Sequence, residues 1–496
     1  MHNNLDLDGV GISYILNNLQ LQTPFSKDLK KNLKFFDDKD KLEEEFLNIE
    51  KMIKAYKNKD LVEIKRYLRK LKDIKNSLLR CKNNMILDEV ELFEIKSFAM
   101  SFEDLRRSYF VLNLDIKNIK LNSLSDLIKI LDPEDKKMPS FFIYEAYSKK
   151  LKIIRDNKKE IEREILKEDS QEKREILMEK RLEIVLEEEK EEYEIRKNIS
   201  NQIIKFVDLF LLNIKSISYL DFLIAKAELA VKYNAIKPKV TDSMSIKIKN
   251  AFNPEVKDIL KKSNKEFTKI SIELNRGVSL ITGANMGGKS ISLKTIALNY
   301  YMAISGFYSF CDEIEICLLD FLSFVSDDMQ SISRGLSTFG AEIMNLKAII
   351  EDINSKKGLV IMDEFARGTN PKEGRSLLKG LLNYLKDKNT ISLLTTHYDN
   401  VCENWMNHYQ VVGLKNVNFE DLKELIKFDK KYSVEIIQKH MDYRLLKMDE
   451  GKNVPKDAFN ICKLLGLEDE ILNGALKYYK EGEINEEQGE FKLGSC

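Results

Sequence analysis

The hydrophobic and polar positions divide the chain into two parts with different periodicities. Within residues 151–200, 29 of the 50 residues are charged, and the apolar residues recur at near-heptad steps at Ile154, Ile161, Ile165, Ile176, Leu182, Leu186 and Tyr193. This spacing leaves one narrow apolar seam on otherwise solvated helices, as in a coiled coil. Polar residues at 167–171 favour a reversal, so the pattern predicts two long antiparallel helices with a tip near Ser170. A single solvated helix is the alternative.

The second part contains short continuous apolar runs. Residues 278–283, 359–364 and 391–397 are such runs, each ending in polar residues, and helical periodicity follows at 289–304 and 374–387. Buried strands that alternate with helices predict a mostly parallel sheet. Ligands of such sheets bind at the carboxyl ends of the strands, where the polar residues of these three runs gather.

The distribution of glycine supports the same division. After Gly9 and Gly11 the next glycine is Gly277, and 18 of the 20 glycines lie within residues 277–496. Glycine supplies the left-handed conformations that tight loops need. The long glycine-free run therefore predicts an all-α first part, and the glycine-rich remainder predicts an α/β domain.

Composition excludes few classes of protein. The 81 basic and 81 acidic residues cancel, so the net charge gives no argument for nucleic acid or a membrane surface, and the charged fraction of 33% indicates much exposed helix. Six scattered cysteines without a CxxC spacing favour free thiols in a reducing compartment. No apolar run reaches 18 residues and the first residues do not resemble a signal peptide, so we expect a cytoplasmic protein with no membrane partner.

Between the first apolar run and the helix that follows it lies a glycine-rich loop that fits G-x-x-x-x-G-K-[ST]. Its residues are Gly283, Ala284, Asn285, Met286, Gly287, Gly288, Lys289 and Ser290. Backbone N–H groups in such a loop surround phosphate oxygens, and the helix N-terminus adds the positive end of its dipole. We expect Lys289 to reach the β- and γ-phosphates and the Ser290 hydroxyl to bind Mg²⁺.

The other two runs end in residues that complete such a site. Asp363 is placed to hold Mg²⁺ through water, and Glu364 to orient or activate the attacking water. A carboxylate pair directly after four apolar residues is costly unless it has a function. His397 could sense the γ-phosphate, with ordinary packing as the alternative. Together these residues predict a nucleotide-hydrolysing site.

Four segments in this order and spacing resemble the ATPase core of the MutS family, within the ABC-type ATPases. They are TGANMGGKS at 282–290, LSTFGAEI at 336–343, VIMDEFARGT at 360–369 and TTHY at 395–398. Weaker similarity links residues 5–26 to the opening of the MutS core, residues 200–240 to its lever helices, and residues 443–446 and 457–475 to the helical element that closes the dimer.

The resemblance implies a role for each matched residue and adds ATP as the nucleotide. Asn285 would contact phosphate, Asp363 would be the Walker B carboxylate, and Glu364 the catalytic base. His397 would be the switch histidine. Ser337 would act in trans, as the signature serine that reaches the γ-phosphate bound by the other subunit of a homodimer. Phe267 is a candidate to stack on adenine, with ordinary packing as the alternative.

The implied fold class is multidomain. An all-α core and lever at 1–139 would carry a long antiparallel coiled-coil clamp at 140–215, with a return lever helix at 216–248. An α/β P-loop ABC-type ATPase domain at 249–440 would follow, then a helical dimerisation element at 441–480 and a polar tail at 481–496. Residues 404–440 are longer than the resemblance leads us to expect.

Three departures from the family bear on function. The core begins near residue 5, so we expect no mismatch-reading domain or connector before it, and because a short polar tail follows the dimerisation element we expect no nuclease domain. Family clamps grip DNA with basic residues near the helical tip, whereas residues 151–200 hold 13 basic and 16 acidic residues. Because DNA affinity comes mostly from neutralising phosphates, we expect weak binding of double-stranded DNA.

These observations lead to a dimeric MutS-type ATPase whose nucleotide state opens and closes a clamp. Its family context is DNA binding and repair, without a mismatch reader of its own. The alternative is an ATP-dependent reactivase partner of a cobalamin-dependent lysine aminomutase, a role associated with some stand-alone MutS-like ATPases. A structural ATPase scaffold is the third possibility.

Overall fold

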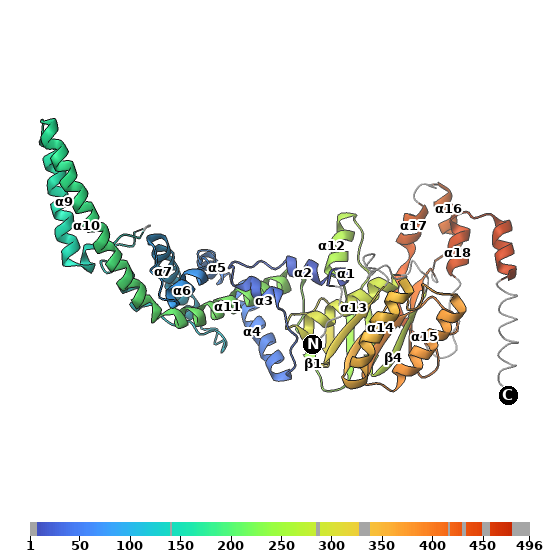
Figure 1. The fold of residues 1–496 in the computed structure, drawn as a ribbon. Coiled ribbons are helices and arrows are strands. Elements are labelled where there is room, and N and C mark those ends of the chain that lie inside the picture. The colour runs from blue at the N-terminus through green and yellow to red at the C-terminus, as the bar shows by residue number, and fades with distance from the viewer. Residues whose placement is uncertain are drawn as a thin grey trace. The chain divides into compact units, whose positions relative to one another are not determined.

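The protein is described by a computed structural model that covers residues 7–138, 141–283, 288–326, 338–414, 417–428, 433–448 and 457–478. The chain is mixed helical and α/β, and it folds into two compact units (Figure 1). Unit 1 comprises Met1–Asn18, Phe35–Phe46 and Lys232–Cys496, and unit 2 comprises Leu19–Lys34 and Leu47–Val231. None of the helices in these described ranges is both long and apolar enough to cross a membrane.

Unit 2 is built from helices. They are α3 (Ser26–Lys31), most of α4 (Lys39–Lys57), α5 (Val62–Leu68), α6 (Lys75–Lys82), α7 (Glu89–Val111), α8 (Ser125–Leu131), α9 (Lys149–Lys167), α10 (Gln171–Ile204) and most of α11 (Val207–Tyr233). A capping box starts α7, in which the Asp88 side chain and the Glu91 side chain each accept from the other's backbone N–H. Phe98 of α7 packs on Phe210 of α11 with ring centroids 5.6 Å apart, at the centre of this helical core.

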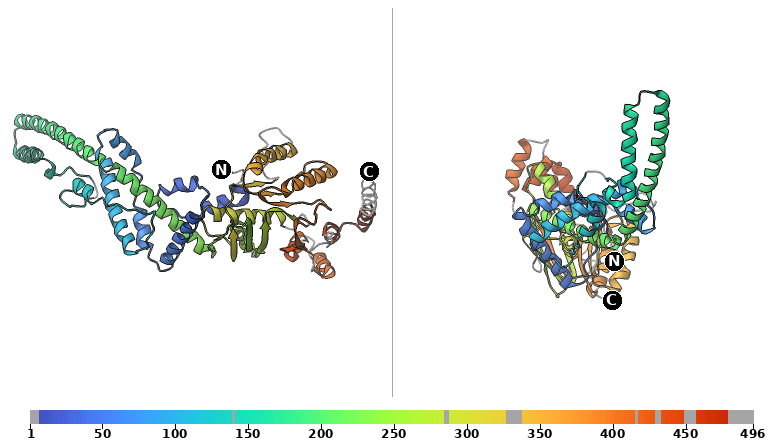
Figure 2. Two further views of the ribbon diagram at one scale, coloured as in Figure 1. Left: turned by 90° about the horizontal axis from the view of Figure 1, so that it is seen from below. Right: turned by 90° about the vertical axis from the view of Figure 1, so that its left-hand side faces the viewer.

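Helices α9 and α10 run side by side as a hairpin whose reversal falls at residues 168–170 (Figure 2). Ion pairs link the two helices: Arg155 Nε lies 2.9 Å from Glu188 Oε1, and Arg181 Nε lies 2.8 Å from Glu162 Oε1. Lys158 also pairs with Glu188.

The predicted apolar seam is wrong on α10. Leu182, Leu186 and Tyr193 are 59%, 49% and 48% exposed, whereas Glu188 and Ile195 are buried. Glu188 occupies a seam position because Arg155 and Lys158 of α9 neutralise it there. A polar residue at the seam cannot be identified from the spacing of hydrophobic residues alone.

The prediction of one return helix over 216–248 is also wrong in its second half. Helix α11 ends at Tyr233, and Asn234 follows with a φ of 52°, a left-handed conformation in which asparagine commonly ends a helix. The strands β1 (Lys239–Val240) and β2 (Ser245–Ala251) come next. Alternating burial along β2 places one of its faces in a core, so tertiary packing there selects a strand.

Unit 1 contains two sheets. The four-stranded sheet has the order β1-β5-β2-β3, with β3 at Ile270–Asn275 and β5 at Glu313–Ile316. The six-stranded sheet has the order β10-β9-β4-β8-β7-β6. Its strands are β4 (Gly277–Thr282), β6 (Phe321–Val325), β7 (Gly358–Met362), β8 (Thr390–Thr395), β9 (Asn407–Gly413) and β10 (Asp442–Lys447). All pairs in it are parallel except β10 with β9, so the carboxyl ends of β4, β7 and β8 lie at one edge.

Unit 1 also contains the helical segments α1 (Leu7–Val10), α2 (Ile12–Asn17), α12 (Pro254–Lys262), α13 (Lys289–Ile304), α14 (Thr338–Ser355) and α15 (Pro371–Lys386). Among these, α13, α14 and α15 contact strands of the six-stranded sheet. Ile349 and Ile353 of α14 share a core with Leu378 and Leu382 of α15 and with Val360 of β7. Asn370 caps α15 by accepting from Lys372 N, and Pro371 occupies the first helical position, where its missing N–H costs nothing.

The C-terminal segment corrects the predicted helical element at 441–480. Residues 442–447 form β10, which pairs antiparallel with β9 and so satisfies backbone groups at the edge of the sheet. The helices α16 (Phe419–Phe428), α17 (Ser433–His440) and α18 (Asp457–Leu464) share one apolar cluster, of which Leu422, Ile437 and Leu464 are buried members. Residues 469–478 are helical as well. The predicted polar tail lies outside the described residues.

Candidate functional site

The predicted phosphate loop joins the end of β4 to the start of α13. Gly283 and Gly288 have φ values of 134° and 76°, which only glycine adopts without strain. A Cβ at Gly283 would lie 3.2 Å from Val411 Cβ, and one at Gly288 would lie 3.0 Å from Tyr443 Cδ1, so both positions are also sterically tight. The other predicted members of the loop, Ala284, Asn285, Met286 and Gly287, lie outside the described residues.

Lys289, the first residue of α13, turns its side chain back toward this loop. Its Nζ donates to the Gly283 carbonyl oxygen at 2.7 Å and lies 3.4 Å from Glu364 Oε1. Burial lowers the pKa of the Lys289 ammonium, and the Glu364 carboxylate opposes that shift. The positive charge is thus held away from solvent by a carbonyl and a carboxylate. Phosphate oxygens could replace these two groups as partners of the ammonium.

Asp363 follows the last residue of β7 and meets Ser290. The Ser290 hydroxyl hydrogen-bonds to the Asp363 carboxylate, and Thr395 Oγ1 donates to Asp363 Oδ1 at 2.6 Å. Burial raises the pKa of Asp363, against the effect of these two hydrogen bonds. A hydroxyl beside a carboxylate supplies the hard oxygen ligands that Mg²⁺ prefers, with its remaining positions left to water and phosphate. The residues present therefore fit a Mg²⁺ ion.

Glu364 is held in a conformation that non-glycine residues rarely adopt. Its φ is 49°, and its backbone N–H donates to Thr395 Oγ1 at 2.9 Å. Its Oε2 is buried and accepts no hydrogen bond from any described residue, although Arg367 Nη1 lies 3.2 Å away and His397 Nδ1 3.8 Å away. A buried carboxylate oxygen without a hydrogen bond is costly, and it is available to a water molecule that must lose a proton.

The segment after Glu364 is anchored by residues that the sequence did not single out. Tyr398 Oη donates to the Ala366 carbonyl oxygen at 2.8 Å, and the Ala366 N–H donates to Glu342 Oε2 at 3.1 Å. Gly374 of α15 lies against Tyr398, because a Cβ there would be 2.2 Å from Tyr398 Oη. These contacts join α14, α15 and the end of β8 around the predicted base.

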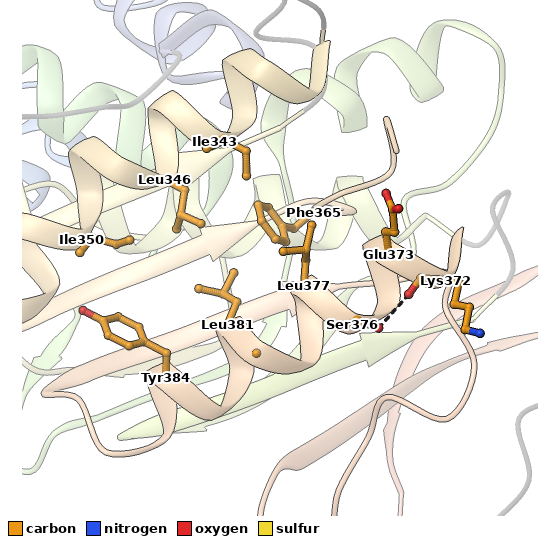
Figure 3. Close-up of a pocket in the computed structure, with 11 residues that line it drawn as sticks. Ile343, Leu346, Ile350, Phe365, Lys372, Glu373, Ser376, Leu377, Leu381 and Tyr384 are labelled. Carbon is orange, nitrogen blue, oxygen red and sulfur yellow. Dashed lines mark hydrogen bonds between the residues drawn. The ribbon is translucent and has the colours of Figure 1, made fainter. Parts of the chain in front are cut away.

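An apolar groove lies between α14 and α15, and Phe365, the residue after Glu364, is one of the residues that line it (Figure 3). Its volume is about 930 Å³, and Figure 3 shows side chains of the two helices facing it, among them Ile343, Leu346, Leu377, Leu381 and Tyr384. Such a lining does not suit a triphosphate, so this groove is separate from the polar site at the strand ends.

Comparisons with known proteins find similarity over the part of the chain that contains these residues. Residues 279–463 match the family model of MutS domain V. The chain is 30% identical over 299 residues to "Endonuclease MutS2" of Caldanaerobacter subterraneus subsp. tengcongensis. This alignment covers 60% of this chain and 34% of that protein. It is 33% identical over 294 residues to "Endonuclease MutS2" of Finegoldia magna, and this alignment covers 58% of this chain and 34% of that protein.

These matches support a MutS-family protein. The match to "Endonuclease MutS2" of Acetivibrio thermocellus has the same extent, with 31% identity over 301 residues, 60% of this chain and 35% of the relative. The matched part of the chain thus spans about a third of the length of these curated relatives.

The remaining predicted site residues have different outcomes. His397 lies beside Glu364, and its ring centroid is 4.2 Å from that of Tyr398. Ser337 lies outside the described residues. Phe267 is half-buried in the loop between α12 and β3, and its role stays a prediction.

His408 is a residue that sequence reasoning left without a role. Its Nε2 lies 2.7 Å from Thr282 Oγ1, at the end of β4, and burial lowers the pKa of its imidazole. The pairing of β9 with β4 brings the two residues together, so no local signal in the sequence could have identified the contact.

Proposed function

We propose that this chain is a MutS-family ATPase that hydrolyses ATP with Mg²⁺ at a dimer interface and couples the nucleotide state to movement of the α9–α10 hairpin as a clamp. The observation that carries the proposal is the meeting of three segments at one edge of the six-stranded sheet. Lys289 lies 3.4 Å from Glu364, and Ser290 hydrogen-bonds to Asp363.

Each of these side chains has a distinct task in the proposed reaction. Lys289 would neutralise phosphate oxygens once they displace Glu364 and the Gly283 carbonyl from its ammonium. Ser290 and Asp363 would hold Mg²⁺, which supplies positive charge to the transferred phosphoryl group. Glu364 would then accept the proton of the attacking water at Oε2, the oxygen that accepts no hydrogen bond from the described residues.

His397 and Ser337 would complete the site. His397 lies 3.8 Å from Glu364 Oε2 and is placed to respond to the γ-phosphate through that carboxylate. Ser337 would act on ATP held by the other subunit of a homodimer. The MutS2 relatives support a DNA-related context, and we carry that context over to this chain as part of the proposal.

A second candidate function follows from the charge of the hairpin. Residues 151–200 hold 16 acidic and 13 basic residues, which is a poor surface for DNA phosphates. The alternative is an ATP-dependent reactivase partner of a cobalamin-dependent lysine aminomutase. Recovery of an inactivated, purified aminomutase in the presence of this chain and ATP would favour it, provided that the Glu364→Gln protein fails to restore activity.

The decisive experiment for the ATPase compares two carboxamide variants of the whole chain. Glu364→Gln should bind ATP at least as tightly as the wild type but hydrolyse it at least ~100-fold more slowly, because the proton acceptor is lost. Glu373→Gln is the matched control, since Glu373 is exposed in the first turn of α15. Phosphate release would be measured at saturating Mg²⁺ and ATP. A Glu364→Gln protein that turns over at the wild-type rate would exclude Glu364 as the base.

A further inference from the structure

Helix α10 presents a stripe of apolar side chains to solvent on the face opposite α9. Met178, Leu182, Leu186 and Tyr193 are 51%, 59%, 49% and 48% exposed. Their spacings of four, four and seven residues place them on one face of the helix. Glu188 and Ile195, which are buried, lie roughly 150° around the helix axis from Leu182, Leu186 and Tyr193, and roughly 90° from Met178.

The ion pairs that link the two helices of the hairpin lie away from the stripe. Contacts between α9 and α10 are made by the buried face, where Arg155 and Lys158 meet Glu188. A single exposed leucine needs no explanation, but apolar residues on three successive turns, with Tyr193 two turns beyond Leu186, are typical of a surface that another molecule covers.

A row of glutamates runs alongside the stripe. Each stripe residue is followed directly by an exposed glutamate, in the order Glu179, Glu183, Glu187 and Glu194. Because consecutive residues are about 100° apart on a helix, these carboxylates form a second ridge parallel to the apolar one. Glu194 lies 3.6 Å from Lys197, and Lys190 lies on the same side of the helix between Glu187 and Glu194, so the ridge is acidic chiefly over Glu179 and Glu183.

The combination of the two ridges determines what kind of partner fits. DNA would bring its phosphates against the glutamate ridge, which is unfavourable. A helix that buries its own apolar stripe on the first ridge and places lysines or arginines over the second satisfies both. Residues 178–193 span roughly 22 Å, so the matching segment would be about four turns long.

We propose that the outer face of α10 is a docking surface for a basic amphipathic helix of a protein partner. The surface is defined by Met178, Leu182, Leu186 and Tyr193 with the glutamate that follows each. This assigns a partner class to the hairpin of the proposed function. It rests on that function only for any coupling to ATP, because the docking itself needs no nucleotide.

The test uses the full chain without nucleotide and two fluorescein-labelled, 18-residue helical peptides. Both peptides carry leucines at four-residue steps, flanked by lysines in one and by glutamates in the other. The lysine peptide should bind at least ~10-fold more tightly than the glutamate peptide by fluorescence anisotropy, a ratio that corresponds to about 1.4 kcal/mol. Equal binding of the two peptides, or no binding of the lysine peptide, would overturn the proposal.

Variants locate the binding to this face. Leu182→Gln with Leu186→Gln should weaken binding of the lysine peptide at least ~10-fold, whereas Ile153→Gln, at a 60% exposed apolar residue of α9, should not. Glu183→Lys with Glu187→Lys should reverse the preference between the peptides. Circular dichroism would show that the helices persist. The ATPase rate should be unchanged in all variants, so the result of this docking test does not depend on whether the proposed ATPase function holds.

Two other occupants are outcomes of the same experiment. If the double leucine variant shifts the monomer–dimer equilibrium in sedimentation and leaves peptide binding unchanged, the stripe contacts a second copy of the chain. If it weakens binding of a 30-base-pair duplex more than binding of the lysine peptide, the face binds nucleic acid. Either result would contradict a protein helix as the occupant.

Discussion

The ammonium nitrogen of Lys289 lies 3.4 Å from Oε1 of Glu364, and the two side chains are only 2% and 11% exposed. They are 75 residues apart in the sequence: Lys289 begins α13, after the loop that follows β4, and Glu364 lies just after β7. Glu364 is a buried counter-ion of Lys289, and Arg367 Nη1 lies 3.2 Å from its other carboxylate oxygen. In the proposed reaction, a phosphate group that binds Lys289 would compete with Glu364, and this would link nucleotide binding to release of the proposed base.

Replacing Lys289 by alanine should abolish ATP binding, because the site loses the charge that neutralises phosphate. Binding would be measured by the anisotropy of a fluorescent ATP analogue. Lys262→Ala, at an exposed position at the end of α12, is the control and should bind ATP normally. Thermal unfolding would show whether the Lys289→Ala protein is folded. A folded variant with unchanged affinity would contradict the assignment of the loop.

Two glycines of α15 form a matched pair for testing the anchor behind Glu364. A Cβ at Gly374 would lie 2.2 Å from Tyr398 Oη and 2.8 Å from the Ala366 carbonyl oxygen, whereas a Cβ at Gly380 meets nothing within 4 Å. Gly374→Ala should therefore cost about 1–3 kcal/mol of unfolding free energy and reduce the ATPase rate. Gly380→Ala should stabilise the protein by up to ~1 kcal/mol, since alanine favours helix. Urea unfolding measures both, and equal effects would rule out the steric explanation.

His408 should make stability depend on pH in the weakly acidic range. Burial lowers the pKa of His408 in the folded state below its ordinary value of 6.5, so the unfolded chain binds the proton more readily. The contribution of neutral His408 to the free energy of unfolding should consequently be fully present above pH 6.5. It should decrease as the pH falls from 6.5 toward the pKa of the folded state.

The measurement is the free energy of unfolding in urea at pH 7.5 and 5.5. His408→Gln retains an acceptor for the Thr282 hydroxyl and should lose less stability between these pH values than the wild type. His440→Gln, at an exposed position at the end of α17, should follow the wild type. If His408→Gln and wild type have the same pH dependence, the histidine is not buried as a neutral group.

Composite sites at a dimer interface would be revealed by mixing two inactive proteins. If Ser337 acts across the dimer, a heterodimer of Ser337→Arg and Lys289→Ala subunits keeps one intact site, so part of the ATPase activity should return. Native mass spectrometry would establish that subunits have exchanged. No activity from exchanged heterodimers would mean that each subunit hydrolyses ATP on its own.

Duplex DNA should bind weakly, with an affinity that falls steeply with salt, because acidic residues outnumber basic ones by 16 to 13 within residues 151–200. We also expect the affinities for homoduplex and single-mismatch duplex to agree within about threefold. The corresponding difference in binding free energy is smaller than the ~1 kcal/mol of one specific base contact. Anisotropy titrations with and without ATP measure both. A clear mismatch preference would show that part of this chain reads DNA, and complete absence of binding would favour a protein cargo.

Much of the architecture of the candidate site could be predicted from local sequence. The strands β4, β7 and β8 lie within one or two residues of the predicted apolar runs, because strands buried on both faces have continuous hydrophobic sequences. Helix α13 covers the predicted 289–304, and the reversal at 168–170 coincides with the predicted tip. Glycine spacing and strand-terminal carboxylates are signals carried by a few neighbouring residues, so they needed no knowledge of the fold.

Only the tertiary structure decided the features that depend on distant partners. Residues 442–447 form a strand because β9 offers an edge to pair with, and Glu188 is buried because Arg155 lies opposite it, 33 residues earlier. Thr395 holds both Asp363 and Glu364, and Tyr398 reaches Ala366, because β8 lies beside β7. Such contacts form between groups far apart in the chain, so the local sequence around one residue does not identify its partner.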